Sequence, residues 1–258
     1  MNRPSQTNLA VLMLIGSCTS LQLGAAVAVP VMAYAGSWLT SAARLLVAAA
    51  ILLALTRPAV RSWRRGDWVR VVFYGVSLGG MNGTFYAAID RIPLGIAVTI
   101  EFLGPLALAA LLSRRLRDFG WVALAGAAVA VLGLSGHTDD GRLDPVGVGF
   151  ALTSAFFWAM YILTGKQVAA QIKGQGPLAV AMLVGATMMI PLGAPSAGIL
   201  SERPALLLPL LAVALLSSVI PYSLELRALG RLSARTFGIL LALEPVIAGL
   251  FGWLILHQ

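Results

Sequence analysis

The chain has 258 residues, of which 59% are hydrophobic and only 11% are charged, and its mean hydropathy is +0.89. A soluble domain of 27.0 kDa could not bury that much apolar surface in one core, so the composition excludes a soluble protein and predicts an integral membrane protein. The formal net charge of +8 does not indicate a nucleic-acid partner, because Lys and Arg fall in short clusters between apolar runs.

Nine apolar runs are long enough to cross a bilayer, where a spanning helix needs about 20 residues. In chain order they cover residues 9–33, 36–55, 71–89, 92–112, 119–135, 146–168, 177–199, 205–224 and 236–256. Pro105 and Pro245 lie inside two of these runs and predict kinks, because proline removes a backbone donor. The polar start and the length of the first run predict a retained span rather than a cleaved signal peptide.

The distribution of Lys and Arg among the connections predicts the orientation of the chain. With a cytoplasmic N-terminus, 14 of these residues fall on the cytoplasmic side and three on the other, with Arg44 left inside a span. This asymmetry satisfies the positive-inside rule. The cytoplasmic set is Arg3, Arg57, Arg61, Arg64, Arg65, Arg70, Arg114, Arg115, Arg117, Lys166, Lys173, Arg227, Arg231 and Arg235, and the opposite set is Arg91, Arg142 and Arg203.

A weak internal repeat suggests two related halves. Displacing the chain by 140 residues lays AIDRIP (88–93) on ALGRLS (228–233) and pairs Pro105 with Pro245. Either the gene segment was duplicated, as in many transporters, or apolar residues align by chance. If each half holds five spans, the second half is inverted relative to the first, and inverted repeats that meet at the membrane midplane are a transporter architecture.

Four stretches resemble the EamA-type drug/metabolite transporter superfamily, and within it bacterial inner-membrane exporters of small amino acids. They are FYGVSLGGMN (73–82), IPLGIAVTIEFLGPLALA (92–109), FFWAMYILTGK (156–166) and IPYSLELRALGRLSARTFGILLALEPVIAG (220–249). The resemblance implies an all-α membrane protein with ten helices in two inverted five-helix repeats and cytoplasmic termini. It also implies proton-coupled export of amino acids such as threonine and homoserine.

The resemblance divides the chain into a first repeat, residues 1–138, and a second repeat, residues 139–258. Members of the superfamily continue past the ninth helix, whereas this chain ends at ILHQ. We therefore expect about nine spans, with the final helix missing and the second repeat incomplete. Such a helix should pack against its own half, so its loss would leave a gap facing lipid.

Glu101 is the only ionised residue in the apolar run 92–112. A carboxylate near the bilayer centre costs about 2.5–3.5 kcal/mol on insertion scales, so it marks a polar interior. Because a proton-coupled transporter needs a group that changes charge inside the membrane, we expect Glu101 to carry the coupling proton. The alternative is that Glu101 forms a permanent ion pair with Arg44. For Arg44 itself, a structural role is favoured.

Polar and aromatic side chains are predicted to line a substrate cavity. Asn82 and Tyr86 are four residues apart, and Trp158 and Tyr161 three apart, so each pair shares one face of a helix. Gln22 adds a polar group in the first span. The alternative for the aromatic residues is a position at the lipid interface, where Trp and Tyr are common.

Two further carboxylates require interpretation. Glu244 precedes Pro245 as Glu101 precedes Pro105, so each half is predicted to bring a carboxylate near a helix irregularity that binds protons or substrate. The alternative for Glu244 is a role in helix packing. Glu225 lies close to a basic stretch, and we expect it at the membrane interface.

Enzymatic and cofactor chemistry find little support. GVSLG (75–79) fits a nucleophile elbow but lies in an apolar run, where small residues serve helix packing. GLSG (133–136) with His137 leaves a weak intramembrane serine protease hypothesis, and a passive facilitator with the same fold is the other alternative to an exporter. One cysteine and two histidines exclude a disulfide framework and a histidine-based metal cluster. We therefore expect a small-molecule substrate, a lipid bilayer and a proton gradient as the only partners, with the oligomeric state left open.

Overall fold

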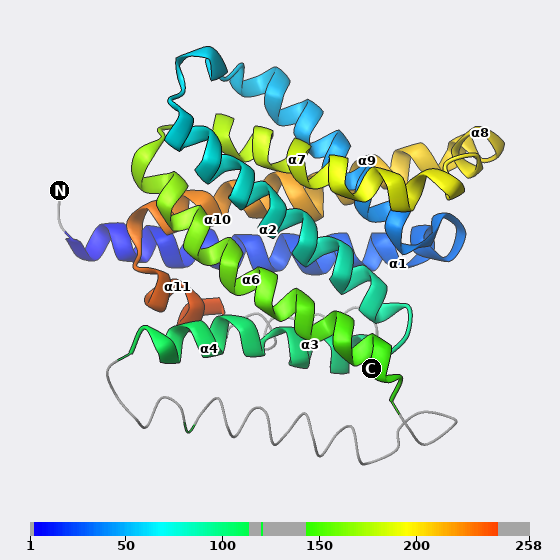
Figure 1. Ribbon diagram of the computed structural model, residues 1–258, viewed down its shortest axis with the longest axis horizontal. Helices are drawn as coiled ribbons and strands as arrows, with labels where there is room; N and C mark the ends of the chain where they lie inside the picture. Colours follow the sequence, from blue (N-terminus) through cyan, green and yellow to red (C-terminus); the bar gives the residue numbers. More distant parts are fainter. Residues whose placement is uncertain (1–2, 114–119, 121–142, 242–258) are drawn as a thin grey trace.

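The computed structural model describes residues 3–113, 120 and 143–241, and all regular secondary structure in this part is helical (Figure 1). The α-helices are α1 (Arg3–Thr56), α2 (Arg65–Ile89), α3 (Leu94–Glu101), α4 (Leu103–Leu111), α6 (Pro145–Gln171), α7 (Gly176–Gly193), α8 (Ile199–Glu202), α9 (Leu207–Ala214), α10 (Ile220–Arg231) and α11 (Ala234–Leu241). Short 3₁₀ segments are Val60–Ser62, Ala194–Ser196 and Pro204–Leu206, and Leu215–Val219 is π-helical.

Four stretches of the described chain are helical, long and apolar enough to cross a membrane. They are Asn8–Thr56, Pro145–Gln171, Gly176–Ser196 and Pro204–Arg231. The all-helical membrane class predicted from the sequence is therefore confirmed. The predicted run 119–135, apart from residue 120, and most of 236–256, including Pro245, lie outside the described residues. The count of nine spans therefore stays a prediction.

The helix α1 contains two of the predicted runs, joined at Gly36. Gly36 has φ 74° and ψ 165°, a backbone conformation that glycine adopts readily because it lacks a Cβ atom. The ribbon of α1 turns sharply there, so that its second part runs away from the first (Figure 1). The boundary predicted between residues 33 and 36 agrees with this break.

A second interruption separates α3 from α4 at Phe102. Pro105 has no backbone N–H, so the carbonyl group of Glu101, four residues earlier, loses its helical partner. The helix ends at Glu101 and resumes at Leu103, and the predicted irregularity near Pro105 is confirmed. Its consequence is that Glu101 lies at a helix end inside an apolar run.

Close helix contacts hold the bundle together. The helix α1 packs against α7, α9 and α10, while α2 packs against α6 and α7. A Cβ atom on Gly79 of α2 would lie only 2.6 Å from the Cα atom of Gly185 on α7, and one on Gly104 of α4 would contact the backbone of Ala155 on α6. Small residues therefore let these backbones approach, as is common between membrane helices.

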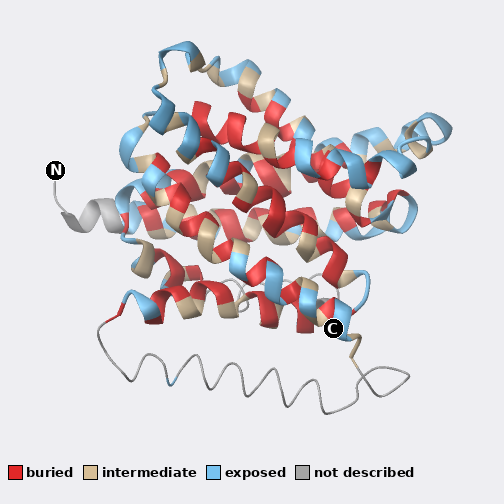
Figure 2. Cartoon of the chain, in the orientation of Figure 1, coloured by how far each residue is buried: buried red, intermediate tan, exposed pale blue. Residues whose placement is uncertain are grey.

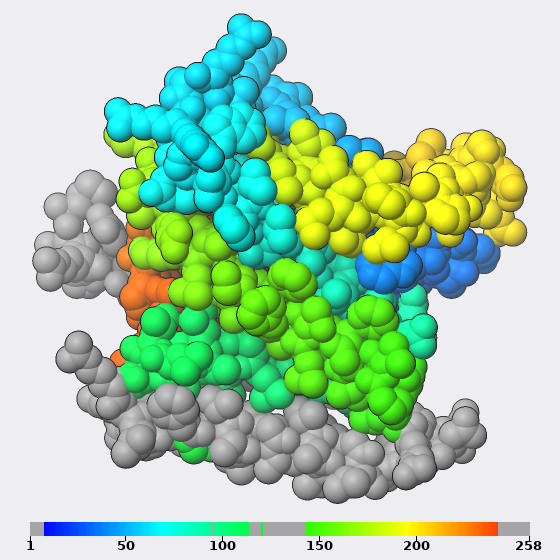
Figure 3. Space-filling view, viewed as in Figure 1, coloured from blue at the N-terminus to red at the C-terminus, as the bar shows by residue number. Residues whose placement is uncertain are grey.

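Buried residues concentrate in the middle of the bundle, and exposed residues lie on its outer faces and helix ends (Figure 2). Much of one face is formed by side chains of α2, α6 and α7 (Figure 3). These helices carry exposed large apolar residues, including Phe73, Phe156 and Ile190. Apolar side chains on the outer surface are expected where a helix faces lipid rather than water.

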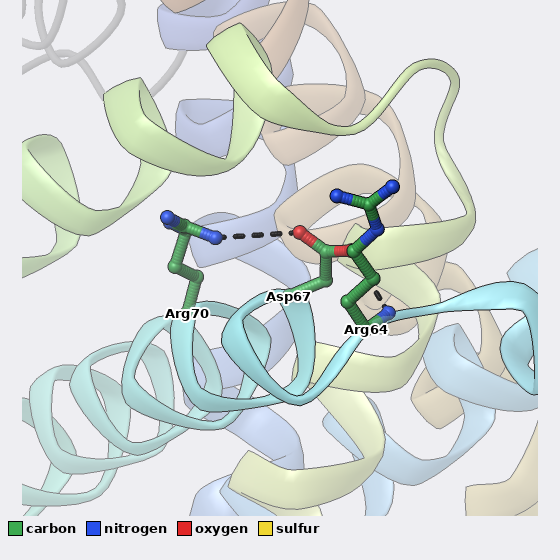
Figure 4. Close-up of polar contacts among 3 residues, drawn as sticks. All are labelled: Arg64, Asp67 and Arg70. Atoms are coloured by element: carbon green, nitrogen blue, oxygen red, sulfur yellow. Dashed lines mark hydrogen bonds and ion pairs between the residues drawn. The ribbon is translucent and has the colours of Figure 1, made fainter.

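Polar contacts fix several helix ends. At the start of α2, the carboxylate of Asp67 accepts a hydrogen bond from the backbone N–H of Arg64 at 3.0 Å and pairs with the Arg70 guanidinium at 3.3 Å (Figure 4). An acidic residue in the first turn also favours the helix dipole. At the end of α10, the Lys166 ammonium donates to the carbonyl oxygens of Leu229 at 2.8 Å and Leu232 at 2.6 Å.

Candidate functional site

Three charged residues are buried in the described part of the chain: Arg44, Glu101 and Glu225. Each lies within a helix or apolar run predicted to span the membrane, and ionisable groups there are expensive and usually functional. The surrounding hydroxyl, amide and aromatic groups come from α1, α2, α6 and α10, which pack on one another. These three charges define the candidate site.

Glu101 is bound to α6 through a serine. The Ser154 hydroxyl lies 2.6 Å from the Glu101 Oε1 atom and 2.9 Å from the carbonyl oxygen of Met81 on α2. Glu101 is 8% exposed and Ser154 is fully buried. Because one hydroxyl has a single proton, it can donate to only one of these two oxygens at a time. A change in the charge of Glu101 would therefore alter which of the two oxygens the Ser154 hydroxyl binds, and with it a hydrogen bond between α2 and α6.

Arg44 contacts Tyr86 instead of a carboxylate. Its Nη1 atom donates to the Tyr86 hydroxyl at 2.9 Å, and its guanidinium carbon lies 5.0 Å from the centre of the Tyr86 ring. The ion pair predicted between Arg44 and Glu101 is absent: the two ion pairs found among the described residues join Arg70 to Asp67 and Arg91 to Asp144. The reason is that Tyr86 engages the guanidinium and Ser154 engages the carboxylate.

Asn82 connects α2 to α10. Its amide nitrogen donates to the Leu78 carbonyl oxygen at 2.8 Å, and its amide oxygen accepts from the Tyr222 hydroxyl at 3.0 Å. Asn82 and Tyr86 are both buried, so the shared helix face predicted for them points into the bundle. Tyr222 was not a sequence candidate, although its spacing from Glu225 on one helix could have indicated it.

Glu225 is the site residue that the sequence misplaced. It is 3% exposed, and its two carboxylate oxygens accept hydrogen bonds from the Ser17 hydroxyl at 2.6 Å and the Tyr161 hydroxyl at 2.9 Å. The expected position at the membrane interface is therefore wrong. Glu225 faces inward because α10 continues to Arg231, so its buried face includes both Tyr222 and Glu225.

Aromatic rings surround this second carboxylate. Tyr161 stacks on Tyr74 with ring centres 5.2 Å apart and lies 5.6 Å from the ring centre of Tyr222. Trp158, three residues earlier on α6, is also buried and packs edge-on against Phe102 at 5.5 Å. Both aromatic candidates on α6 therefore point into the bundle rather than toward lipid.

Two predicted residues are not brought into this network. Gln22 is half-buried on α1, and no side-chain hydrogen bond of the described residues involves it. Glu244 lies outside the described residues, as do Ser135 and His137 of the protease hypothesis. Ser77 of the GVSLG stretch lies within α2 and donates to the Phe73 carbonyl oxygen at 2.7 Å, so it is not at a strand-to-helix turn. Gly75 and Gly79 of that stretch instead make close contacts with α7.

The buried cation and the two carboxylates suit a small zwitterion better than an apolar or highly charged ligand. Hydroxyl groups from Ser17, Ser154 and Tyr161 supply hydrogen bonds to the carboxylates without cancelling their charge. Among residues 3–113, 120 and 143–241, no cluster of three His, Cys, Asp or Glu side chains could hold a metal ion. The side chains of this site offer charge pairing, hydrogen bonding and proton transfer.

Comparisons with known proteins agree with a transport site. Residues 145–258 match the EamA-like transporter family. Two proteins named threonine/homoserine exporter RhtA, from Salmonella typhimurium (strain LT2) and Escherichia coli (strain K12), are 41% and 40% identical over 250 residues, covering 97% of this chain and 84% of each relative. A solved structure described as "Crystal structure of protein" has a TM-score of 0.69 over 100% of this chain and 90% of that one. At 20% identity, this last similarity concerns the fold alone.

Proposed function

Because the chain belongs to the EamA-like transporter family, we propose that it is a secondary active exporter of small amino acids of the threonine and homoserine type. Membership of this family makes it a transporter and not an enzyme, as the sequence predicted. The names of its relatives support the substrate class, and the buried charges of Arg44, Glu101 and Glu225 support a site for a zwitterion.

In this proposal, the protein lies in the bacterial inner membrane with a cytoplasmic N-terminus. Its architecture is of the ten-helix inverted-repeat type, with about nine predicted spans in this chain and with residues 1–138 and 139–258 as the two halves. Alternating access moves these halves so that the buried site opens first to the cytoplasm and then to the outside. The burial of Arg44, Glu101 and Glu225 fits a conformation in which the site is closed.

One observation carries the coupling mechanism: Glu101 is buried in an apolar run, bound to Ser154 and without a cation within 4.0 Å in the described structure. A carboxylate in that position can be neutralised by a proton rather than by an ion pair. Protons enter from outside and neutralise Glu101, and their release to the cytoplasm drives the outward movement of the amino acid. The proton gradient is thus the energy source, and no bound cofactor takes part.

Efflux from proteoliposomes with an imposed pH gradient tests the proposal. Wild-type protein should export threonine or homoserine against its concentration gradient, and dissipating the pH gradient should abolish this uphill movement. The variant Glu101→Gln keeps the size and one acceptor oxygen but cannot exchange a proton. It should lose gradient-driven export while retaining exchange of labelled for unlabelled substrate.

The same assay separates the exporter from a passive facilitator. A facilitator would equilibrate the amino acid at the same rate with or without the pH gradient, and would never concentrate it. Full gradient-driven export by Glu101→Gln would contradict the proton role of Glu101 while leaving export itself intact.

A further inference from the structure

Arg44 is a buried cation that forms no ion pair with a carboxylate in the described structure. It is 4% exposed, and no acidic group among residues 3–113, 120 and 143–241 approaches it within 4.0 Å. Arginine stays charged in proteins, and a buried charge without a counter-ion is strongly unfavourable. Some group that is absent from this set of contacts should therefore complete the environment of Arg44.

The contacts that Arg44 does make leave part of its guanidinium available. Nη1 donates to the Tyr86 hydroxyl, and the ring of the same tyrosine supplies a cation–π contact at 5.0 Å. The guanidinium also interacts with the hydroxyl group of Tyr222. The Nε atom is buried and has no hydrogen-bond acceptor among the described residues. A buried unpaired donor costs about 1–3 kcal/mol, and more when it belongs to a charged group, so an acceptor at Nε would be favourable.

The required partner is a planar anion. A guanidinium presents paired N–H donors in a rigid fork that matches the two oxygens of a carboxylate. Glu101 lies near enough to interact electrostatically with Arg44 but is engaged by Ser154, and Glu225 is engaged by Ser17 and Tyr161. Both buried carboxylates of the described residues are thus engaged by hydroxyl groups, and a carboxylate from outside the chain would match the free side of the guanidinium.

We infer that Arg44 binds the α-carboxylate of the transported amino acid, a role that rests on the proposed function. The N–H groups of Nε and of the second terminal nitrogen donate hydrogen bonds to the two carboxylate oxygens. Tyr86 holds the guanidinium in place. The substrate ammonium then lies toward Glu101. Arg44 is reached when the bundle opens on one side, and the bound carboxylate supplies a counter-ion that is not found among the described residues.

This assignment predicts which compounds the site accepts. Threonine should bind, whereas its amide and its amino-alcohol analogue, which keep the ammonium and side chain but lack the carboxylate, should compete weakly. A polar site whose partner is missing is left with an unpaired buried group, so the loss of affinity should be about tenfold or more. Competition by the three compounds against labelled threonine export measures this discrimination in wild-type protein, without any substitution.

Three variants then assign the discrimination to Arg44. Arg44→Gln should raise the KM for threonine about tenfold or more and make the three compounds equal competitors, while Arg44→Lys, which keeps charge without the fork, should restore part of the discrimination. Arg203→Gln is the matched control, because Arg203 is exposed and makes a similar contact with the ring of Tyr34, at 4.7 Å. Arg203→Gln should prefer threonine over its amide and its amino-alcohol analogue to the same extent as wild type.

The outcomes separate the inference from the proposed function. If wild-type protein exports no small amino acid, the proposed function fails. If it exports threonine but accepts the amide equally well, or if Arg44→Gln discriminates like wild type, only the role of Arg44 fails. Ligand-dependent thermal stabilisation of purified wild-type protein by threonine, but not by its amide, supports the role even if Arg44→Gln does not fold.

Discussion

Asn82 and Tyr222 form a 3.0 Å hydrogen bond across 140 residues of sequence, the same displacement that aligns Arg91 with Arg231. Residues related by a twofold axis contact one another only close to that axis. The displacement also relates the first residue of α3, Leu94, to the first residue of α11, Ala234. If the chain consists of two inverted halves, as proposed, Asn82 and Tyr222 would lie near the axis that relates them.

The bond between the two halves can be measured with a double-mutant cycle. Tyr222→Phe removes the donor hydroxyl, Asn82→Ala removes the acceptor, and the double variant removes both. We expect a coupling free energy of about 0.5–1.5 kcal/mol in unfolding measured in detergent, because a net hydrogen bond contributes about that much. Strictly additive single effects would mean that the hydrogen bond does not stabilise the contact between α2 and α10.

Tyr161 should stabilise the fold through its hydroxyl as well as its ring. Tyr161→Phe keeps the stacking on Tyr74 but removes the donor to Glu225, and we expect the free energy of unfolding to fall by about 1–3 kcal/mol. Tyr34→Phe is the matched control, since Tyr34 is 56% exposed, and it should change stability by less than about 0.5 kcal/mol. Denaturant titration followed by tryptophan fluorescence compares them; equal effects of the two variants would refute a buried hydrogen bond at Glu225.

The contact between Asp144 and Arg91 should give stability a dependence on pH. Asp144 caps α6 outside the membrane span, and the backbone N–H of Val146, together with the Arg91 guanidinium, holds the pKa of Asp144 below its usual value. Because the folded state lowers this pKa, the stabilisation is present above the usual pKa of Asp and is lost as the pH falls through the lower, folded-state value.

Asp144→Asn should therefore lower the Tm most near neutral pH, and the difference from wild type should shrink on acidification to about pH 3. Thermal unfolding across this range checks the expectation. Arg91→Gln serves as the comparison, because it removes the guanidinium but leaves the backbone donor of Val146 in place. This variant should lower the Tm by less than Asp144→Asn does near neutral pH. A difference between wild type and Asp144→Asn that does not vary with pH would show that the carboxylate charge has no part in it.

The features predicted correctly from the sequence depend on local chemistry. The boundary between residues 33 and 36, the interruption near Pro105 and the burial of Asn82 and Tyr86 follow from the limits of the apolar runs, the missing proline N–H and helical spacing. Glu101 was recognised because a single charge in an apolar run has few explanations. Such signals need no knowledge of how one helix is rotated against another.

The partners of the buried charges could not be predicted in this way. Whether Arg44 meets Glu101 or Tyr86 depends on the rotation of α1 and α3, and hydroxyl donors such as Ser154 compete for the same carboxylate. Glu225 was misplaced because a nearby basic stretch suggested the interface. Its spacing from Tyr222 and Leu229, three and four residues away on one helix face, was the signal for burial that a fuller pattern analysis could have used.

Gly79 tests whether close helix packing, rather than enzymatic chemistry, explains the GVSLG stretch. A Cβ atom there would lie 2.6 Å from the Cα atom of Gly185, so Gly79→Ala should push α2 from α7 and lower the free energy of unfolding by about 1–3 kcal/mol. Gly149→Ala on α6 is the matched control, because a Cβ atom there meets nothing within 4 Å, and it should be neutral or stabilise by up to about 1 kcal/mol. Ser77→Ala should leave both stability and export nearly unchanged, since the Ser77 hydroxyl bonds only within its own helix. If Gly79→Ala is tolerated and Ser77→Ala abolishes function, the packing explanation is wrong.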